Sequence, residues 1–372
     1  MLVLKNLLRR KVRTALSLLG IAIGIAAIIA FHAIGQGFRK SLDRYMRESG
    51  AQALVLSRLM QDPAFSRVTK EDQEFVRGLP QVEHLSAGTF TLASPRGLKV
   101  KTGRMPTLLI FGRPPGDRIL DKFKGKVRGR VIAADDEVMV GHIAAETFGL
   151  KGADKETLEV FGRAFRVVGI YDSGVSFENV GAIVSNSVVQ TVLKTESINM
   201  GFLYLKPGAE WSAVRDAVEA HNGELTVIRT EEFTNFYNQL EYIDWFVWVI
   251  SLVSVIIGGL GVLNTMLMAV SERTREIGTL RAVGWSQPMV LRLILTEGVA
   301  ISFLGGAAGL GVGTVGAELL ILLAPSGFLS THYSGELYGI AMVVAVVLGF
   351  VGAFYPAVRA SRLSPIEALK YE

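Results

Sequence analysis

Two long apolar runs in the second half of the chain constrain its fold more than any other feature. The run from Trp245 to Val270 contains no charged residue, and another follows from Met289 to Leu323. At 1.5 Å per residue, either run is long enough to cross the roughly 30 Å hydrocarbon core of a bilayer as a helix. An apolar share of 50% over 372 residues points the same way. We therefore expect a membrane protein.

The N-terminal segment predicts another membrane span. An apolar run over residues 14–34 follows the basic residues Lys5, Arg9, Arg10, Lys11 and Arg13. A signal peptide has the same order, but its apolar region is shorter and ends at a small-residue cleavage site, which this segment lacks. The basic cluster predicts a cytoplasmic N-terminus. Gly20 and Gly24 lie one helical turn apart, where small residues let another helix approach closely.

The middle of the chain, residues 50–231, has the composition of a globular α+β domain, with short β-rich runs between turn residues. Three helices are predicted. The first begins at Thr69, where Asp72 completes a capping arrangement, the second includes residues 144–148, and the third covers residues 209–221. Strands are predicted over 53–56, 89–92, 98–101, 108–111, 138–141, 158–160, 165–170, 182–184, 202–205 and 225–228, with a hairpin about Gly162.

The C-terminal half predicts three more spans. A helix over residues 231–244 runs into the second span, where the small residues Gly258, Gly259 and Gly261 favour close helix packing. The third run is too long for one upright crossing, so its start is expected at the membrane surface. The connection over residues 324–336 has no Lys or Arg, whereas basic residues follow the fourth span. This asymmetry predicts both termini in the cytoplasm and residues 50–231 outside it.

The predicted organisation is therefore an α-helical membrane protein of four transmembrane helices, with an α+β extracytoplasmic domain inserted between the first and second. Its parts are an N-terminal cytoplasmic segment with the first span and an outward stalk (1–49), the extracytoplasmic domain (50–231), a stalk with the second span (232–270), a cytoplasmic coupling helix (271–288), the third span (289–324), the fourth span (337–355) and a cytoplasmic tail (356–372).

Several functions find no support in the sequence. The chain has no phosphate-binding G-x-x-x-x-G-K-[ST] loop, no G-x-S-x-G elbow and no H-E-x-x-H helix. Its five histidines lack ligand-like spacing, and with no cysteine there is no thiolate metal site. The net charge of +5 comes largely from residues that flank apolar runs, so no nucleic-acid partner is expected. We predict neither an enzyme nor a cofactor or metal site in this chain.

Two carboxylates in the third run leave an alternative open. Glu318 inside a span is a candidate proton relay, although its position about two turns before Pro325 favours a place near the outer interface. For Glu297 we expect a structural pairing with Arg292 or Arg281. An ion-coupled transporter would need discontinuous helices and paired repeats, which the sequence does not show.

A patterned charged block separates the second and third runs. As a helix, residues 272–284 allow Glu272 to meet Arg275 and Glu276 to meet Arg273, while Gly284 is placed to end it. Its apolar stripe would fill a pocket in a soluble partner. A solvated loop with paired charges explains the spacing equally well. The candidate partner-contacting residues are Glu272, Arg273, Arg275, Glu276, Ile277, Leu280 and Arg281.

The block resembles the coupling segment of the MacB/FtsX-like permease family of ABC transporters, whose pattern E-R-x-R-E-I-G-x-x-R-A-x-G is matched from Glu272 to Gly284. Residues 6–24 and 356–369 also resemble the family, and residues 138–141 with 165–170 are similar to its extracytoplasmic domain. The likeness therefore spans the whole chain.

This resemblance implies a permease of the type VII, mechanotransmission class, located in the cytoplasmic (inner) membrane. It implies an ABC-type ATPase subunit that carries ATP and Mg, a second copy of the chain or a close homologue, membrane lipid, and a periplasmic adaptor or outer-membrane channel as a further partner. The expected activity is export or extraction of a hydrophobic, lipid-like, lipoprotein, peptide or drug substrate. The alternative is an FtsX-like regulator that activates an extracytoplasmic cell-wall hydrolase.

Overall fold

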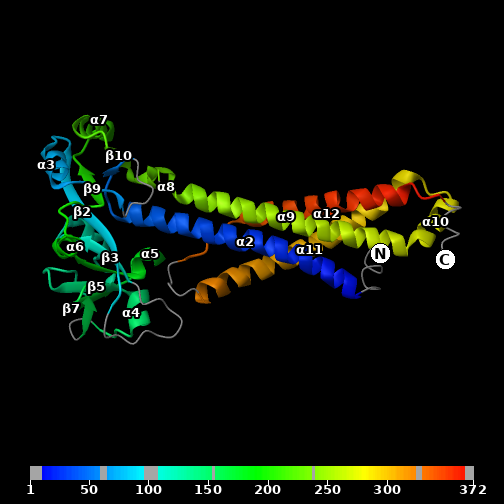
Figure 1. Ribbon diagram of the computed structural model, residues 1–372, viewed down its shortest axis with the longest axis horizontal. Helices are drawn as coiled ribbons and strands as arrows, with labels where there is room; N and C mark the ends of the chain where they lie inside the picture. Colours follow the sequence, from blue (N-terminus) through cyan, green and yellow to red (C-terminus); the bar gives the residue numbers. More distant parts are fainter. Residues whose placement is uncertain are drawn as a thin grey trace. The chain divides into compact units, whose positions relative to one another are not determined.

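The computed structural model describes residues 11–58, 65–95, 108–152, 156–236, 239–323 and 329–364. The chain divides into two compact units (Figure 1). The helical unit comprises Met1–Gln36, Asp244–Leu320 and Thr331–Glu372, and the sheet unit comprises Gly37–Ile243 and Ile321–Ser330. Four apolar helices, with an α/β sheet domain between the first and the second, confirm the predicted fold class.

A mixed sheet forms the centre of the sheet unit. Among the described residues it has ten strands, in the order β10-β1-β9-β2-β3-β8-β5-β7-β4, with β6 paired to β7. The pairs β3–β8 and β5–β7 are parallel, and the others are antiparallel. The strands are β1 (Ala53–Ser57), β2 (Val82–Ala93), β3 (Leu108–Arg113), β4 (Val127–Gly129), β5 (Glu137–Gly141), β6 (Thr157–Val160), β7 (Arg163–Tyr171), β8 (Gly181–Ser185), β9 (Met200–Leu205) and β10 (Leu225–Arg229).

Strand β1 shows how the sheet is buried. Ala53 and Val55 join one apolar cluster, whereas Leu54 and Leu56 join another. Because successive side chains point to opposite faces, β1 is covered on both sides, which is why its sequence is an almost continuous apolar run.

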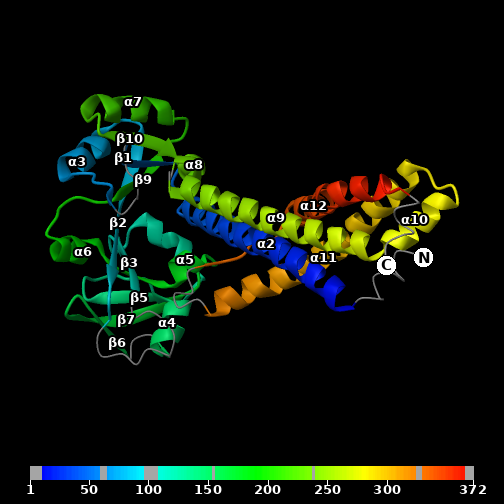
Figure 2. The same ribbon diagram turned by 45° about the vertical axis from the view of Figure 1, so that its right-hand side comes forward.

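Short helices cover the sheet. Helices α3 and α7 contact each other, α7 contacts β10, and α6 contacts β2, β3 and β8; Figure 2 shows them along the sheet. The helical elements of this unit are α3 (Lys70–Gly78), η2 (Arg118–Phe123), α4 (His142–Phe148), α5 (Ser176–Asn179), α6 (Asn186–Leu193), α7 (Trp211–His221), η3 (Thr230–Glu232) and α8 (Phe233–Phe236).

Local sequence signals predicted much of this unit. Thr69 caps α3 with Asp72 in a capping box, as predicted. The β6–β7 hairpin turns through Phe161 and Gly162, both at positive φ. Strand β2 begins earlier than predicted because its mixed-polarity first half pairs with β9, and the β-branched segment of α6 gave no helix signal. The predicted strand over residues 98–101 lies outside the described residues.

The helical unit is built from long apolar helices. It contains helix α2 (Lys11–Glu48) as far as Gln36 and helix α9 (Gln239–Glu272) from Asp244 onward. The other helices of this unit are α10 (Thr274–Ala282), α11 (Gln287–Leu323) and α12 (Gly335–Ser361). Four of the described helices are long and apolar enough to cross a membrane: the candidate spans are Leu18–Glu48, Asp244–Glu272, Gln287–Leu323 and Gly335–Ser361. Helix α12 continues through Pro356 past the predicted end of the fourth span.

Glycines on one face of α11 set its approach to α2. A Cβ added to Gly305, Gly309 or Gly313 would lie 2.8–2.9 Å from atoms of α2, including the backbone oxygen of Ala22. The three glycines are spaced by four residues and so form one stripe along the helix. Only glycine allows the two backbones to approach this closely.

Candidate functional site

A sharp corner joins α9 to α10. Helix α9 ends at Glu272 and α10 begins at Thr274, while Arg273 between them has φ −111° and ψ 17°, outside the helical values. The observed helix, Thr274–Ala282, is therefore shorter than the single helix predicted over residues 272–284, and Glu272 belongs to the preceding helix. We name Glu272 to Trp285 the corner segment.

Gly284 ends the corner segment's helix, as predicted. Its φ is +102°, a conformation that favours glycine. The Gly284 N–H donates to the Arg281 carbonyl at 3.1 Å, and the Trp285 N–H donates to the Leu280 carbonyl at 3.0 Å. These two bonds form a Schellman motif. Trp285 in turn packs against the apolar core of the helical unit, which anchors this end of the helix.

Arg273 fixes the other end of the corner. Its Nε lies 2.9 Å from Oε2 of Glu276 in α10, and its Nη1 lies 3.1 Å from Oε2 of Glu297 in α11. Glu297 is buried, so the guanidinium supplies the charge that a buried carboxylate requires. The predicted partners of Glu297 were wrong, because Arg292 is exposed and Arg281 donates to the Trp285 carbonyl at 2.9 Å.

The inner face of α10 packs within the chain itself. Ile277 is 2% exposed and joins the core of the helical unit, and Gly278 beside it is buried. The expectation that Ile277 fills a pocket in a partner is therefore wrong, because its own bundle already covers it. Leu280 is half-buried, so the predicted apolar stripe serves mainly to seat α10 on the bundle.

The outer face of α10 carries both charge and an apolar side chain. Arg275, Glu276 and Thr279 are exposed, and Val283 is 78% exposed at the end of the helix. Arg275, Thr279 and Val283 are spaced by four residues, so they share one face. Val283 was not among the predicted partner-contacting residues, although its spacing of eight residues from Arg275 is a sequence signal for this face.

The predicted packing glycines have mixed surroundings. A Cβ on Gly24 would lie 3.1 Å from the Ser254 carbonyl oxygen of α9, so this position is a close helix contact. Gly258 and Gly259 face Leu348 at ordinary distances, and Gly20 and Gly261 have open space around them in the described part of the chain. Within the helical unit, tighter contacts than these join α11 and α12: a Cβ on Gly298 would overlap Ala353, and one on Gly349 would lie 2.6 Å from Ser302.

A buried ionic cluster in the sheet unit holds the end of α2. Lys122 of η2 lies 2.6 Å from Glu178 of α5, with side-chain exposures of 7% and 2%. The Lys122 ammonium also lies 4.5 Å from the centre of the Tyr45 ring, and the Tyr45 hydroxyl accepts a hydrogen bond from Arg113 of β3. Burial lowers the pKa of Lys122, against the opposing effect of Glu178. The cluster links α2 to the sheet through charged groups shielded from water.

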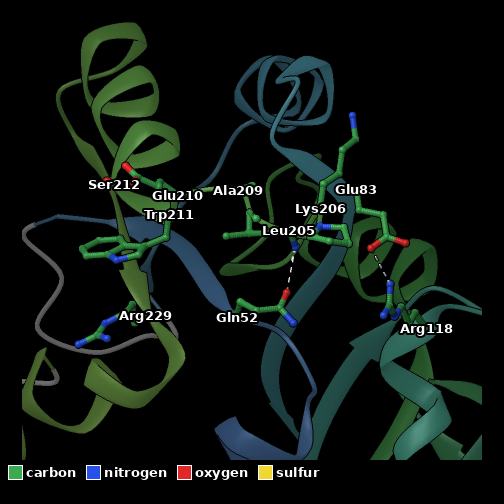
Figure 3. A pocket seen from close by; sticks show the side chains of 12 residues that line it. Gln52, Glu83, Arg118, Leu205, Lys206, Ala209, Glu210, Trp211, Ser212 and Arg229 are labelled. Carbon is green, nitrogen blue, oxygen red and sulfur yellow. Dashed lines mark hydrogen bonds and ion pairs between the residues drawn. The ribbon is translucent and has the colours of Figure 1, made fainter.

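An open hollow of about 850 Å³ lies at the end of the sheet unit near α7 (Figure 3). Gln52 accepts the Leu205 N–H at 2.9 Å, and Arg118 is paired with Glu83 at 3.2 Å. Arg229, which faces Trp211, is paired with Glu232 at 2.6 Å. These two guanidinium groups have carboxylate partners, and the Lys206 ammonium donates to the Pro80 carbonyl at 2.7 Å, so the three cations that line the hollow are all engaged within the chain.

No group of acidic or histidine side chains that could hold a metal ion is present among the described residues. Glu318, the alternative proton-relay candidate, is exposed and accepts a hydrogen bond from Thr331 at 2.8 Å, while the Tyr333 hydroxyl lies 2.9 Å from the same oxygen. These contacts with the connection before α12 are typical of a carboxylate at a helix end.

Comparison with known families agrees with this architecture. Residues 14–221 match the MacB-like periplasmic core domain, and residues 248–365 match the FtsX-like permease C-terminal domain. The first match alone covers more than half of the chain. The chain belongs to the MacB/FtsX-like permease family. The resemblance inferred from the charged block is thus confirmed, and the four apolar helices are those of a multi-pass ABC transporter permease.

Relatives of this permease differ in how much of their length it covers. It is 26% identical to the macrolide export ATP-binding/permease protein MacB of Bdellovibrio bacteriovorus, over 99% of this chain and 61% of that protein. It is 24% identical to the ABC transporter permease YknZ of Bacillus subtilis, over 99% of this chain and 98% of that protein. It also resembles the crystal structure of the extracellular domain of YknZ, with a TM-score of 0.37 and 16% identity over 48% of this chain and 99% of that one. The chain spans 57% to 61% of the length of the MacB relatives that it matches.

Proposed function

We propose that this chain is the membrane subunit of an ABC transporter whose ATP and Mg are bound by a separate ATPase subunit. The observation that carries the proposal is the corner segment, a short helix anchored on its inner face with charge and an apolar side chain on its outer face. A helix held in this way presents a rigid surface to a soluble partner. The match to YknZ, which is named a permease and is covered over 98% of its length, supports an ATPase on another chain.

The permease has both termini in the cytoplasm and residues 50–231 outside the membrane. The Lys and Arg residues near the N-terminus and after the fourth span support this orientation. The corner segment, between the second and third spans, then faces the cytoplasm with the ATPase. The match of residues 14–221 to a periplasmic core domain supports the same assignment.

ATP-driven closure of the ATPase subunits is converted into movement of the extracytoplasmic domain. The corner segment takes up the movement, and the bundle passes it to α2. Helix α2 is continuous from Lys11 to Glu48, and its end is held by the buried cluster around Lys122 and Glu178. A rigid helix clamped to a packed sheet transmits a rigid-body shift.

The work done is export of a hydrophobic or drug-like substrate, assisted by a periplasmic partner and a second copy of the chain. Macrolide export in the name of the MacB relative supports this class of substrate. Gly20 and Gly261, which have open space beside them, are available for packing against the second copy. An FtsX-like regulator of a cell-wall hydrolase would use the same corner segment, but it would show no substrate-stimulated ATP turnover.

The test is to disturb the outer face of α10 without touching its anchored face. Arg275→Glu and Val283→Asp should each weaken capture of the co-expressed ATPase subunit at least about tenfold, because interface charges and apolar contacts contribute on that scale. Both should also lower stimulated ATP turnover. Glu336→Lys, which reverses an exposed carboxylate in the first turn of α12, is the matched control and should leave both measurements unchanged.

Wild-type capture and turnover in both outer-face variants, at normal membrane levels, would overturn the coupling assignment. Ile277→Asp is unsuitable for this purpose. It places a carboxylate in the chain's own core and would therefore disrupt the fold whether or not a partner docks.

A further inference from the structure

A groove along the first part of α11 combines an apolar wall with one cationic end. It encloses about 680 Å³ between α11 and Phe350 of α12. Leu295, Val299, Phe303 and Leu304 line its length, and Arg292 lies near its start. Phe303, Leu304 and Phe350 are about half exposed, so this apolar surface is open to the surroundings in the described chain.

The charges of α11 give the depth of this groove in a bilayer. No charged residue occurs between Glu297 and Glu318. Their separation along the helix is about 31 Å at 1.5 Å per residue, which equals the thickness of the hydrocarbon core. The two carboxylates therefore mark the two boundaries of that core. Arg292, five positions before Glu297, lies about 7 Å further out, at the depth of the lipid headgroups.

The length of the groove matches most of one leaflet. From Arg292 to Leu304 the helix rises about 18 Å, of which about 7 Å lies at headgroup depth and about 11 Å lies inside the leaflet's roughly 15 Å of hydrocarbon. An acyl chain that starts at headgroup depth would therefore follow the groove through most of that leaflet. A soluble ligand or a short peptide would not match both the depth and the apolar length.

The charge at the groove's end is available to a ligand. Arg292 is exposed, and neither a hydrogen bond nor an ion pair links it to another described residue. The nearby Arg273 is held by Glu276 and Glu297, and Arg281 is held by the Trp285 carbonyl. A guanidinium presents paired donors that fit two oxygens of a phosphate group. The attraction between this guanidinium and a lipid headgroup is stronger when the lipid carries a net negative charge than when it carries none.

We propose that this groove binds one anionic glycerophospholipid, with its phosphate at Arg292 and an acyl chain along Val299 and Phe303. Its assignment to the cytoplasmic leaflet rests on the proposed function, which places the corner segment in the cytoplasm. The binding itself does not. An anionic lipid at this position lies against the start of α11, next to the corner segment. It therefore forms part of the surface that surrounds α10.

The test uses the full chain purified in mild detergent and exposed to phosphatidylglycerol or phosphatidylcholine. Native mass spectrometry then measures the fraction of protein that retains lipid. The wild type should retain phosphatidylglycerol preferentially. Arg292→Gln should weaken this retention at least about tenfold, because hydrogen bonds to charged groups are worth that factor. Arg359→Gln removes another exposed cation, near the end of α12 and outside the groove, and should change retention little.

A second variant tests the acyl-chain half of the site while leaving the charge in place. Val299→Trp fills the groove and should lower retention of phosphatidylglycerol to the level of Arg292→Gln. Equal retention of the two lipids by the wild type, or wild-type retention in both groove variants, would overturn the proposal.

The groove could instead be covered by a second copy of the chain. Because the sequence has no cysteine, Thr296→Cys introduces a single thiol in the groove. Disulfide-linked dimers formed through it in membranes would overturn the lipid site, whereas a thiol that stays monomeric supports it. These measurements need no ATPase, so a failed coupling experiment would leave their outcome unaffected.

Discussion

Replacing Lys122 with Met tests whether the buried cluster in the sheet unit is as strongly coupled as its geometry indicates. Lys122 and Glu178 are almost completely shielded, at 7% and 2% exposure, and their charged atoms lie 2.6 Å apart. Loss of one partner of such a pair typically costs about 3–5 kcal/mol, because the remaining charge is buried without compensation. Lys122 also lies over the rings of Tyr45 and Phe123, which adds a smaller cation–π loss.

We therefore expect Lys122→Met to lower the free energy of unfolding of the sheet unit by about 4 kcal/mol. Adding Glu178→Gln should recover at least about 2 kcal/mol of that loss, because the double variant leaves no unpaired charge in the interior. The non-additivity, measured as a double-mutant cycle, separates the ion pair from simple loss of packing.

The assay is pulse proteolysis of the full chain in detergent micelles across a urea series, which reports cleavage of the sheet unit. Lys124→Met is the matched control, since Lys124 is 75% exposed and pairs with an exposed Asp121. Its loss should stay within about 0.5 kcal/mol, as for other surface pairs. If Lys122→Met cost no more than this control, or if the two substitutions were simply additive, the reasoning about the buried pair would be refuted.

Two further predictions concern other contacts. Arg130 donates to Glu137, which is 3% exposed, and holds the pKa of that carboxyl at about 2 against a usual 4.5. Because the folded pKa is lowered, the carboxylate's contribution of about 3 kcal/mol is present above pH 4.5 and is lost as the pH falls toward 2. Urea titrations at pH 7 and pH 3 should show about 2 kcal/mol of this loss in the wild type, because pH 3 lies between the two pKa values, and a much smaller loss in Glu137→Gln. In the helical unit, Gly309→Ala should destabilise the packing of α2 on α11 by about 1–3 kcal/mol, because its Cβ would lie 2.8 Å from the Ala22 carbonyl oxygen. Gly311→Ala, in open space, should be neutral or slightly stabilising, and thermal unfolding in detergent distinguishes the two; equal effects would contradict the close approach.

The sequence by itself determined the features that depend on neighbouring residues. Runs of apolar residues are sufficient to identify the four candidate spans, since a span needs only length and low charge. The Thr69 capping box, the turn at Gly162 and the helix end at Gly284 are also local, because each depends on backbone conformation within a few residues. The charged block could likewise be recognised from its own residues, although a loop and a docked helix remained equally compatible with its spacing.

Only the tertiary structure decided which residues meet across the fold. Arg273 was predicted to pair with Glu276, and it does, but its bond to Glu297 depends on how α11 packs beside the corner. That packing also buries Ile277 and leaves Val283 exposed. Because both side chains are apolar, the sequence alone could not show which of the two is buried. The stripe of Gly305, Gly309 and Gly313 could be counted in the sequence, but its contacts on the partner helix α2 lie 284 to 287 residues earlier in the chain. Contacts of this kind depend on the shape of the complete bundle and on which surfaces it removes from water, so spacing along the chain cannot specify them.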